Sequence, residues 1–471
     1  MGILYVTVFV FITLIASFSL SQVYAEPTVL DDDYIIEKFV TGLEYTTTME
    51  FVGDDILVLE KNTGKVIRIL ENGVILNEPV LDVPVSVTWE SGLLGITSVS
   101  DKVYLYFTES LSGFDSYNTE NSKNVVYQYD WNGEKLTNPV LIKELLSVAD
   151  VHNGGVMTKG LNNEVYFVIG DQDQRTIFQN VPVETNYETG SIFKIDTINN
   201  DIELFAMGIR NSFGLGVDPV TGYLWDTENG TEYLDEINLV RQGFNSGWVN
   251  VLGPVDREYP VSTEDVRDIP VQTIPEQFEN FVYSDPEFSW HNAVGPTAIT
   301  FPEKDICRKY SEWLFVGDFH NGKIYKFQLN ADRTGFVFSN PDLSDLVLDN
   351  NDEMDEITFA TGFQGVIDIK FHDGVMYVVV IGDGSIYKIY PKELQSSGTG
   401  VREQPMIEPS SDSLSAGIIA WFNQNSFFHE LCMKCHSNFC SVNSISHIDD
   451  YASYIWEMMY CFIQQTFLIQ E

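Results

Sequence analysis

The sequence predicts an all-β protein, a six-bladed β-propeller with a short C-terminal extension. Three observations predict it: six recurrences of a short alternating strand beside a turn, the near absence of helical periodicity, and turns rich in Gly, Asn and Asp about every dozen residues. Closing a ring of sheets protects the strand edges that such a long β-protein would otherwise leave open. A pair of β-sandwiches is the alternative arrangement.

The six recurring segments combine a few alternating apolar and polar residues with an adjacent turn. In chain order they are 64-GKVIRIL-70, 124-NVVYQYDWNG-133, 190-GSIFKID-196, 235-DEINLV-240, 322-GKIYKFQL-329 and 384-GSIYKIY-390. Their average spacing of roughly 64 residues suits one four-stranded blade with long loops. Three of them follow another strand, so each pair predicts a hairpin. These preceding strands are 54-DDILVLEKNTG-64, 313-WLFVGDFHNG-322 and 376-MYVVVIGDG-384.

Residues 1–25 form an apolar run followed by small and polar residues, and Val23 and Ala25 suit signal peptidase. A cleaved signal peptide, and hence an extracellular or cell-surface location, is the simplest interpretation. An uncleaved N-terminal anchor is the alternative, because no basic residue precedes the run and the run is almost long enough to span a bilayer. No continuous apolar run of 18 residues follows between residues 26 and 400, so we expect a soluble body.

The charge balance excludes some partners. The chain has 26 Lys and Arg against 69 Asp and Glu, a formal net charge of −43. Long-range electrostatics therefore repel phosphate backbones and anionic lipid, so we expect neither nucleic acid nor extensive membrane contact. A solvated acidic surface is the ordinary interpretation of this charge, and capture of cations is the alternative.

The C-terminal region has its own composition. Residues 394–415 are predicted to be a linker because they are rich in Ser, Gly and Pro, and residues 416–471 follow as a Cys-containing tail. Cys432, Cys435 and His436 have the C-x-x-C-H spacing at which c-type haem is attached. The short tail disfavours haem, since a haem needs an apolar pocket and a second axial ligand. Disulfides or a zinc site that include Cys440 and Cys461 are favoured over haem, and a tail of no clear role is the third possibility.

Two stretches of the body contain candidates for chemistry. His152 stands before two glycines, so its imidazole could approach a ligand closely and abstract a proton near neutral pH, although an ordinary polar loop residue would look the same. Arg210 supplies a permanent cation suited to a carbonyl or a carboxylate. The turn 228-ENGTEYLDE-236 begins with Glu228 and offers the carboxylate and backbone oxygens that calcium prefers, without the regular spacing of an EF-hand.

Several motifs together resemble one known family. They are 92-GLLGI-96, 152-HNGG-155, 166-YFVIGDQ-172, 208-GIRN-211 with 214-GLGVDP-219, 235-DEINLV-240 and 246-SGW-248. Over residues 35–392, in order, the chain is similar to the glucose/sorbosone dehydrogenase family. The resemblance implies a six-bladed propeller that binds pyrroloquinoline quinone and calcium, oxidises the anomeric carbon of an aldose sugar, and passes the electrons to an acceptor that remains unknown.

The resemblance also implies roles for individual residues. His152 matches the general base, and Arg210 and Asn211 match residues that contact the quinone, with Arg210 polarising the carbonyl beside the hydride acceptor. Gly230 and Thr231 match the positions whose backbone carbonyls hold calcium, although the family often has Pro in place of Thr231. Glu90 stands where the family has a Gln or Glu that faces the cofactor.

On the other side of the pocket the sequence departs from the family. His320 replaces the family's cofactor-binding Lys, and the Arg-x-Arg-Asp segment reads 365-GVID-368, so that only Asp368 remains. The quinone's three carboxylates need cationic partners. The retained base, Arg-Asn pair and metal turn predict a secreted quinoprotein aldose dehydrogenase. The loss of the cations motivates the alternative, a non-catalytic propeller that binds glycan or protein.

Overall fold

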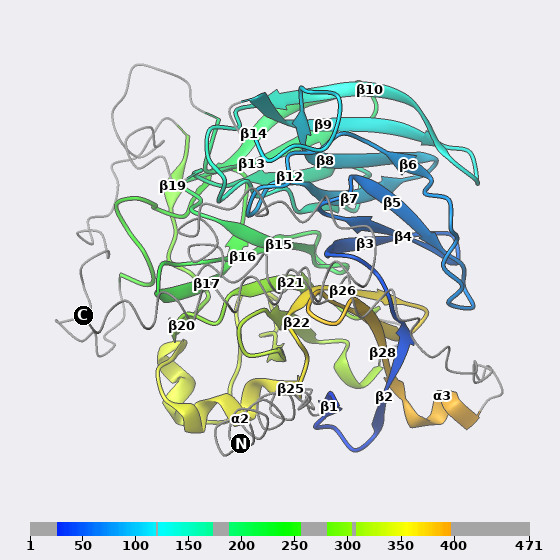
Figure 1. The fold of residues 1–471 in the computed structure, drawn as a ribbon. Helices are drawn as coiled ribbons and strands as arrows, with labels where there is room; N and C mark the ends of the chain where they lie inside the picture. Colours follow the sequence, from blue (N-terminus) through cyan, green and yellow to red (C-terminus); the bar gives the residue numbers. More distant parts are fainter. Residues whose placement is uncertain (1–25, 119–120, 173–187, 256–279, 304–307, 397–471) are drawn as a thin grey trace, which may run out of the picture. The chain divides into compact units, whose positions relative to one another are not determined.

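The computed structural model of the chain describes residues 26–118, 121–172, 188–255, 280–303 and 308–396 (Figure 1). These residues are almost entirely β-strands and turns. The helical elements among them are short: η2 (Arg308–Tyr310), η3 (Pro341–Asp345), η4 (Asn351–Glu353), α2 (Met354–Ile357) and α3 (Lys392–Ser396). Within this described part, no helix is long and apolar enough to cross a membrane.

The described strands form six hydrogen-bonded sheets. The first contains β3 (Thr46–Val52), β4 (Asp55–Glu60), β5 (Lys65–Ile69) and β6 (Leu81–Asp82), and the second β7 (Leu93–Val99), β8 (Lys102–Ser110), β9 (Ser122–Trp131) and β10 (Leu136–Leu145). The third contains β11 (Met157–Lys159), β12 (Val165–Ile169), β13 (Ser191–Asp196), β14 (Asp201–Met207), β18 (Phe244–Asn245) and β19 (Val282–Tyr283).

The remaining three sheets complete the set. The fourth contains β15 (Ser212–Val217), β16 (Leu224–Glu228), β17 (Tyr233–Val240), β20 (Phe288–Asn292) and β24 (Val347–Leu348). The fifth contains β21 (Pro296–Thr300), β22 (Trp313–Asp318), β23 (Lys323–Gln328), β25 (Thr358–Thr361) and β1 (Thr28–Val29). The sixth contains β26 (Val366–His372), β27 (Val375–Val380), β28 (Ser385–Pro391) and β2 (Tyr34–Val40).

The first strand of each sheet lies innermost, and these strands contact one another in a closed order. β3 contacts β7, and the contacts continue through β11, β15, β21 and β26 back to β3. Each of the six recurring sequence segments lies in a different sheet, and the three predicted hairpins are formed by β4 with β5, β22 with β23, and β27 with β28. The predicted all-β class and propeller arrangement are therefore confirmed.

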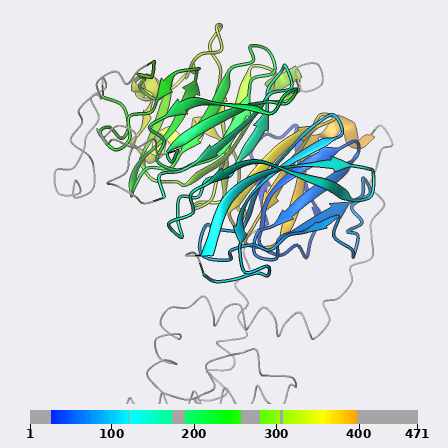
Figure 2. The same ribbon diagram turned by 90° about the horizontal axis from the view of Figure 1, so that it is seen from above.

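The two ends of the described chain meet in the sixth sheet. β2 pairs antiparallel with β28, so that Tyr34 lies opposite Pro391 and Ile36 opposite Ile389. Figures 1 and 2 show this blue N-terminal strand beside the orange C-terminal strand. β1 likewise pairs with β25 of the fifth sheet. The N-terminal strands thus complete two sheets that the C-terminal part of the described chain begins.

Apolar clusters fill the spaces between neighbouring sheets. Leu57 and Leu105 belong to the cluster between the first and second sheets, and Phe167 and Tyr104 to the next one. The other four neighbouring pairs of sheets each enclose a cluster of the same kind. Alternation within each strand explains this pattern, because every sheet must bury side chains on both of its faces.

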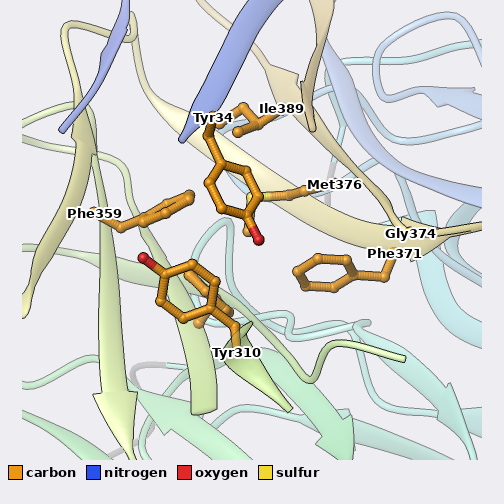
Figure 3. A pocket seen from close by; sticks show the side chains of 8 residues that line it. Tyr34, Tyr310, Phe359, Phe371, Gly374, Met376 and Ile389 are labelled. Atoms are coloured by element: carbon orange, nitrogen blue, oxygen red, sulfur yellow. The ribbon is translucent and has the colours of Figure 1, made fainter. Parts of the chain in front are cut away.

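One small gap remains in the packing beside the N-terminal strand (Figure 3). It has a volume of about 10 Å³, and Tyr34, Tyr310, Phe359, Phe371 and Met376 are among the side chains that line it. That volume is at the lower limit for one water molecule. The gap is therefore a packing feature between two sheets rather than a ligand site.

A larger cavity of about 370 Å³ lies on the axis at the ends of the innermost strands. It is lined by residues of all six, including Glu50, Thr97, Thr158, Leu215, Ile299 and Lys370. The loops that contain His152 and Arg210 lead into the opposite ends of these strands. The loops of His152 and Arg210 therefore lie at one end of the axis, and this cavity lies at the other.

Several predictions fall outside the described residues. The signal peptide at residues 1–25 and the tail at 416–471, with Cys432, Cys435 and His436, belong to this group. The linker predicted from residue 394 begins inside α3 (Lys392–Ser396), and the rest of it also lies outside.

Candidate active site at one end of the propeller axis

The candidate site is built from loops that lead into innermost strands and from turns between second and third strands. Glu90 precedes β7, His152 precedes β11, and Arg210 and Asn211 precede β15. Residues 229–232 connect β16 to β17. Because these connections all lie at one end of the sheets, residues distant in sequence meet there.

His152 is held by two carboxylates. Its backbone N–H donates to Oε2 of Glu90 at 2.6 Å, and its Nδ1 atom lies 2.6 Å from Oδ1 of Asp171. Asp171 is 1% exposed, and its Oδ2 accepts a hydrogen bond from Nε1 of Trp248 at 2.6 Å. Since the Asp171 carboxylate accepts a hydrogen bond from Nδ1–H, we assign to His152 the tautomer that leaves Nε2 as an acceptor.

The local backbone explains the HNGG motif. His152, Gly154 and Gly155 all have positive φ angles, of 56°, 65° and 106°. A Cβ atom on Gly155 would lie 2.5 Å from Cβ of Leu94, and one on Gly154 would lie 2.7 Å from the carbonyl oxygen of Val168. The glycines therefore allow the tight loop that presents His152 between the second and third sheets.

Trp248 links Arg210 to Asp171, the carboxylate that holds His152. Its guanidinium carbon is 5.5 Å from the centre of the Trp248 ring, and its Nη1 donates to the carbonyl oxygen of Asn229 at 2.8 Å. Burial lowers the pKa of Arg210, while the negative charges of Asp171, Glu228, Asp235 and Glu90 oppose this shift. Cation–π contact with Trp248 and this acidic surrounding keep the guanidinium charged.

Two buried polar atoms at this point have no hydrogen-bond partner among the residues that the structure describes. They are Nε of Arg210 and Oδ1 of Asn211, on adjacent residues. Nδ2 of Asn211 donates to Oε2 of Glu90 at 3.3 Å, so Glu90 connects Asn211 to His152. Buried polar groups without partners are rare, and here they are what a bound polar ligand would satisfy.

The turn after β16 has the geometry of a possible cation site. The N–H of Gly230 donates to Oδ1 of Asp235 at 2.8 Å, and a Cβ atom on Gly230 would lie 2.1 Å from the carbonyl oxygen of Tyr233. Among the described residues, no hydrogen bond reaches the carbonyl oxygens of Gly230 and Thr231. These two oxygens, next to buried carboxylates, are donors that suit a hard cation.

Glu228 belongs to a buried acidic cluster beneath this turn, together with Glu236 and Asp226. Its Oε1 accepts from the N–H of Arg210 at 2.6 Å, and its Oε2 accepts from Oγ of Ser246 at 2.7 Å. Burial raises the pKa of Glu228 well above its ordinary value, and Glu236 and Asp226 reinforce the effect. Burial also raises the pKa of Glu236 to about 8 and that of Asp226 to about 7.

His320 lies next to the same turn, on the side of the fifth sheet. It is exposed, and a Cβ atom on Gly295 would lie 3.2 Å from its imidazole ring. The N–H of Gly295 donates to Oδ2 of Asp235 at 2.9 Å, so His320 adjoins the buried carboxylate that supports Gly230.

Asp368 occupies a different setting. Its Oδ2 accepts from Oγ1 of Thr48 at 2.7 Å and from the N–H of Met49 at 3.0 Å, which ties β26 to β3. Gly365 has a φ of 83°, and a Cβ atom there would lie 3.2 Å from the Phe319 ring. Ile367 packs against an apolar cluster. The backbone at 365 thus disfavours any long side chain, and no described contact links Asp368 to His152 or Arg210.

The structure therefore connects Glu90, His152, Asn211, Arg210 and Glu228 through hydrogen bonds. It also adds two residues to which the sequence assigned no role, Asp171 and Trp248. Both lie in quoted motifs, in 166-YFVIGDQ-172 and 246-SGW-248. An acidic residue two positions beyond the end of β12 is a usable signal for Asp171, whereas only the fold brings Trp248 to it.

A closed ring of sheets with histidine, arginine and buried carboxylates at one end of its axis defines the class: a β-propeller with a polar ligand site. A family model described as glucose/sorbosone dehydrogenase matches residues 43–346. The chain belongs to the glucose/sorbosone dehydrogenase family.

Relatives by sequence are distant. An uncharacterized protein of Synechocystis is 26% identical over 380 residues, which is 72% of this chain and 82% of that protein. Quinoprotein glucose dehydrogenase B of Acinetobacter calcoaceticus is 28% identical over 239 residues, which is 43% of this chain and 49% of that protein. The match to this second relative thus spans only about half of its length.

Solved structures share the fold. The aldose sugar dehydrogenase of Escherichia coli, in its apo-form, superposes with a TM-score of 0.59 at 18% identity and covers 76% of this chain and 100% of that one. The PQQ-bound form of an aldose sugar dehydrogenase from Streptomyces coelicolor has a TM-score of 0.56 at 18% identity, with coverage of 78% and 98%. At this identity the likeness establishes the propeller fold alone.

Proposed function

We propose that this chain is a secreted quinoprotein oxidoreductase that oxidises an aldose sugar at its anomeric carbon, with pyrroloquinoline quinone, when bound, supplying the hydride acceptor. The observation that supports it best is the pair of unpartnered buried atoms, Nε of Arg210 and Oδ1 of Asn211, beside a histidine whose tautomer a buried carboxylate fixes. We take the six sheets as the six blades of this propeller, and we propose export on the basis of residues 1–25.

In this proposal His152 is the general base. Its Nε2 atom would take the proton of the sugar's anomeric hydroxyl as the C–H bond breaks. Asp171 holds the imidazole through Nδ1 and stabilises the positive charge that His152 acquires. Trp248 restricts Asp171 from the other side by donating to its second oxygen.

Arg210 and Asn211 would hold the quinone. The free Nε of Arg210 can donate to a carbonyl oxygen, and the stacking on Trp248 keeps the guanidinium plane in one orientation. Glu90 fixes the loop of His152 and the amide of Asn211 at once, so that base and quinone-binding residues keep their spacing. This side of the site fits the group.

The carbonyl oxygens of Gly230 and Thr231 would hold calcium. The pKa of the buried Glu228 is raised, so its carboxylate adds negative potential at the turn only when it is ionised. His320 and Asp368 are the candidates on the opposite side. Gly365 and Ile367 stand where the family has two Arg, and the cation that the structure shows near Asp368 is Lys370, whose Nζ lies 3.9 Å from Oδ1 of Asp368 and which lines the cavity at the other end of the axis. The fit to a ligand with three carboxylates is therefore poorer on this side.

The proposal is tested by reconstituting the full chain with pyrroloquinoline quinone and calcium and measuring dye reduction with a panel of aldoses. We expect turnover with at least one aldose, and a loss of about 10²- to 10⁴-fold in His152→Gln. Quinone binding by His152→Gln, followed by absorption, serves as the control for folding. No turnover with any common aldose, although the quinone is bound, contradicts the proposal.

A second candidate function is a propeller that binds glycan or protein without catalysis. The observation that favours it is the loss of cations at Gly365, Ile367 and His320. Tight, calcium-dependent binding of the quinone to the purified chain would contradict this second candidate.

A further inference from the structure

Lys61 lies at the same end of the axis as His152, in the turn between β4 and β5. Its backbone N–H donates to the carbonyl oxygen of Tyr45 at 2.9 Å, and its own carbonyl accepts from the N–H of Leu93 at 3.0 Å. Tyr45 and Leu93 stand at the starts of β3 and β7. The main chain of Lys61 is therefore fixed between the first two sheets, where they open into the candidate site.

The side chain of Lys61 runs across the GLLG segment toward the Glu90 loop. A Cβ atom on Gly92 would lie 2.7 Å from Cγ of Lys61 and 2.4 Å from its carbonyl oxygen, so the glycine leaves room for this stem. The negative charge of Glu90 acts on the ammonium group of Lys61. Glu90 in turn accepts hydrogen bonds from His152 and Asn211.

The ammonium group has few partners. Its described hydrogen bond is to Oδ1 of Asn62, at 2.9 Å, and no carboxylate of the described residues lies within 4.0 Å of it. Of the fourteen other lysines that the structure describes, eight have such a partner: Lys38, Lys102, Lys123, Lys135, Lys143, Lys194, Lys309 and Lys370. Burial lowers the pKa of Lys61 to about 8, and Glu90 opposes the shift.

A half-buried cation without a carboxylate partner is costly in a folded protein, and it suits a site that receives an anion. Arg210 shares this property, since no described carboxylate oxygen lies within 4.0 Å of its guanidinium nitrogens. The two cations thus approach Glu90 from different places: Lys61 from the first sheet, which neighbours the sixth sheet where the family's two Arg are missing, and Arg210 from the connection between the third and fourth sheets.

We propose that Lys61 binds a carboxylate group of the quinone held at this end of the axis, and so supplies one of the cations that His320, Gly365 and Ile367 no longer provide. This inference rests on the proposed function. The inference extends that function by assigning to the turn between β4 and β5 a part in cofactor binding.

The test is a titration of the full chain with pyrroloquinoline quinone at saturating calcium. Binding is measured by the quenching of tryptophan fluorescence. We expect Lys61→Met to weaken binding by about 10- to 100-fold, the effect of one charge-assisted hydrogen bond, and Lys61→Arg to keep most of the affinity. Lys159→Met is the matched control. Lys159 is exposed at the other end of the axis, so the same change of net charge there leaves binding unaltered.

The outcomes separate the two claims. If the wild-type chain binds no quinone, the proposed function fails and this inference falls with it. If the wild type binds but Lys61→Met binds equally well, only the inference is overturned. A parallel titration with glucuronate and glucose tests whether Lys61 binds a carboxylate on the sugar instead of one on the quinone. If Lys61→Met weakens the binding of glucuronate but not that of the quinone, the assignment to the quinone is also overturned.

Discussion

The Nδ1 atom of His152 lies 2.6 Å from Oδ1 of Asp171, which is itself almost completely buried. His152 lies in the connection from β10 to β11, and Asp171 lies 19 residues further along, in the connection from β12 to β13. Through the second oxygen of Asp171 it extends to Trp248, and through the Trp248 ring to Arg210. Proposed base and proposed quinone-binding cation therefore rest on one buried carboxylate.

The first prediction concerns this carboxylate. Asp171→Asn places an amide beside Nδ1 of His152, so the opposite tautomer, with Nε2 protonated, becomes favourable. We expect kcat to fall by about 10²- to 10⁴-fold while the quinone affinity changes little. Asp101→Asn, in an exposed hairpin turn, is the control. A variant that loses quinone binding together with kcat would show that Asp171 acts mainly on the fold.

The second prediction concerns the turn at Gly230. Calcium at saturation should stabilise the wild-type chain by about 2.7 kcal/mol when its concentration is 100 times Kd. Because a Cβ atom on Gly230 would lie 2.1 Å from a carbonyl oxygen, Gly230→Ala should abolish this calcium-dependent rise in Tm. Gly335→Ala, where a Cβ atom would meet only a side-chain nitrogen at 3.3 Å, should keep it. An unchanged response to EDTA in Gly230→Ala would exclude this turn as the calcium site.

The third prediction concerns the pH dependence of stability. Burial raises the pKa of Glu236 from 4.5 to about 8, so between these values the folded chain holds a proton that the unfolded chain has lost. Stability therefore falls as pH rises through this window, by about 1.4 kcal/mol per pH unit for one group. Glu236→Gln removes this contribution and should reduce the slope of the urea unfolding free energy between pH 5 and about 8, while Asp226 and Glu228, whose pKa values burial also raises, keep the remainder.

Glu236→Gln is also compatible with its surroundings. Nδ2 of Asn238 donates to Oε2 of Glu236 at 3.2 Å, and Oδ1 of Asn238 has no partner among the described residues, so rotation of the Asn238 amide would turn Oδ1 toward the new amide N–H. Glu203→Gln, which changes an exposed ion pair with Lys194, is the control and should leave the slope unaltered. An identical slope in wild type and Glu236→Gln would mean that Glu236 is ionised in the folded chain.

The fourth prediction concerns the pH dependence of quinone binding. The pKa of Lys61 is lowered to about 8, so the ammonium loses its proton as pH rises through that value, with Glu90 as the charged group that faces it. We expect quinone affinity to decrease above about pH 8 in the wild type and to stay level in Lys61→Arg, whose guanidinium remains charged. Parallel profiles for the two proteins would assign the decrease to another group.

The predictable part of the fold is local. The hairpin of β22 and β23 follows from alternation on both sides of an Asn-Gly turn, and β27 with β28 follows from the same rule. Strands of two residues, such as β18 and β19, have no such pattern. They pair in parallel with neighbours far along the chain, and only the packing around them determines their place.

The site divides in the same way. His152 and Arg210 stand in short motifs whose order along the chain is informative, so the sequence could predict them. Trp248 is 77 residues from the aspartate that it contacts, and Lys61 is an ordinary residue of a turn. Their positions depend on which sheet edges meet around the axis, and no local pattern in a single sequence reveals that arrangement.

The pairing of Tyr34 with Pro391 has a consequence for biosynthesis. During synthesis at about 5 to 20 residues per second, roughly 20 to 70 seconds separate the appearance of these two residues. For that interval β2 has no strand to pair with, and its backbone donors and acceptors are open to other chains. If the chain is exported as proposed, this interval keeps it incompletely folded, the state in which a polypeptide can be threaded through a translocation pore.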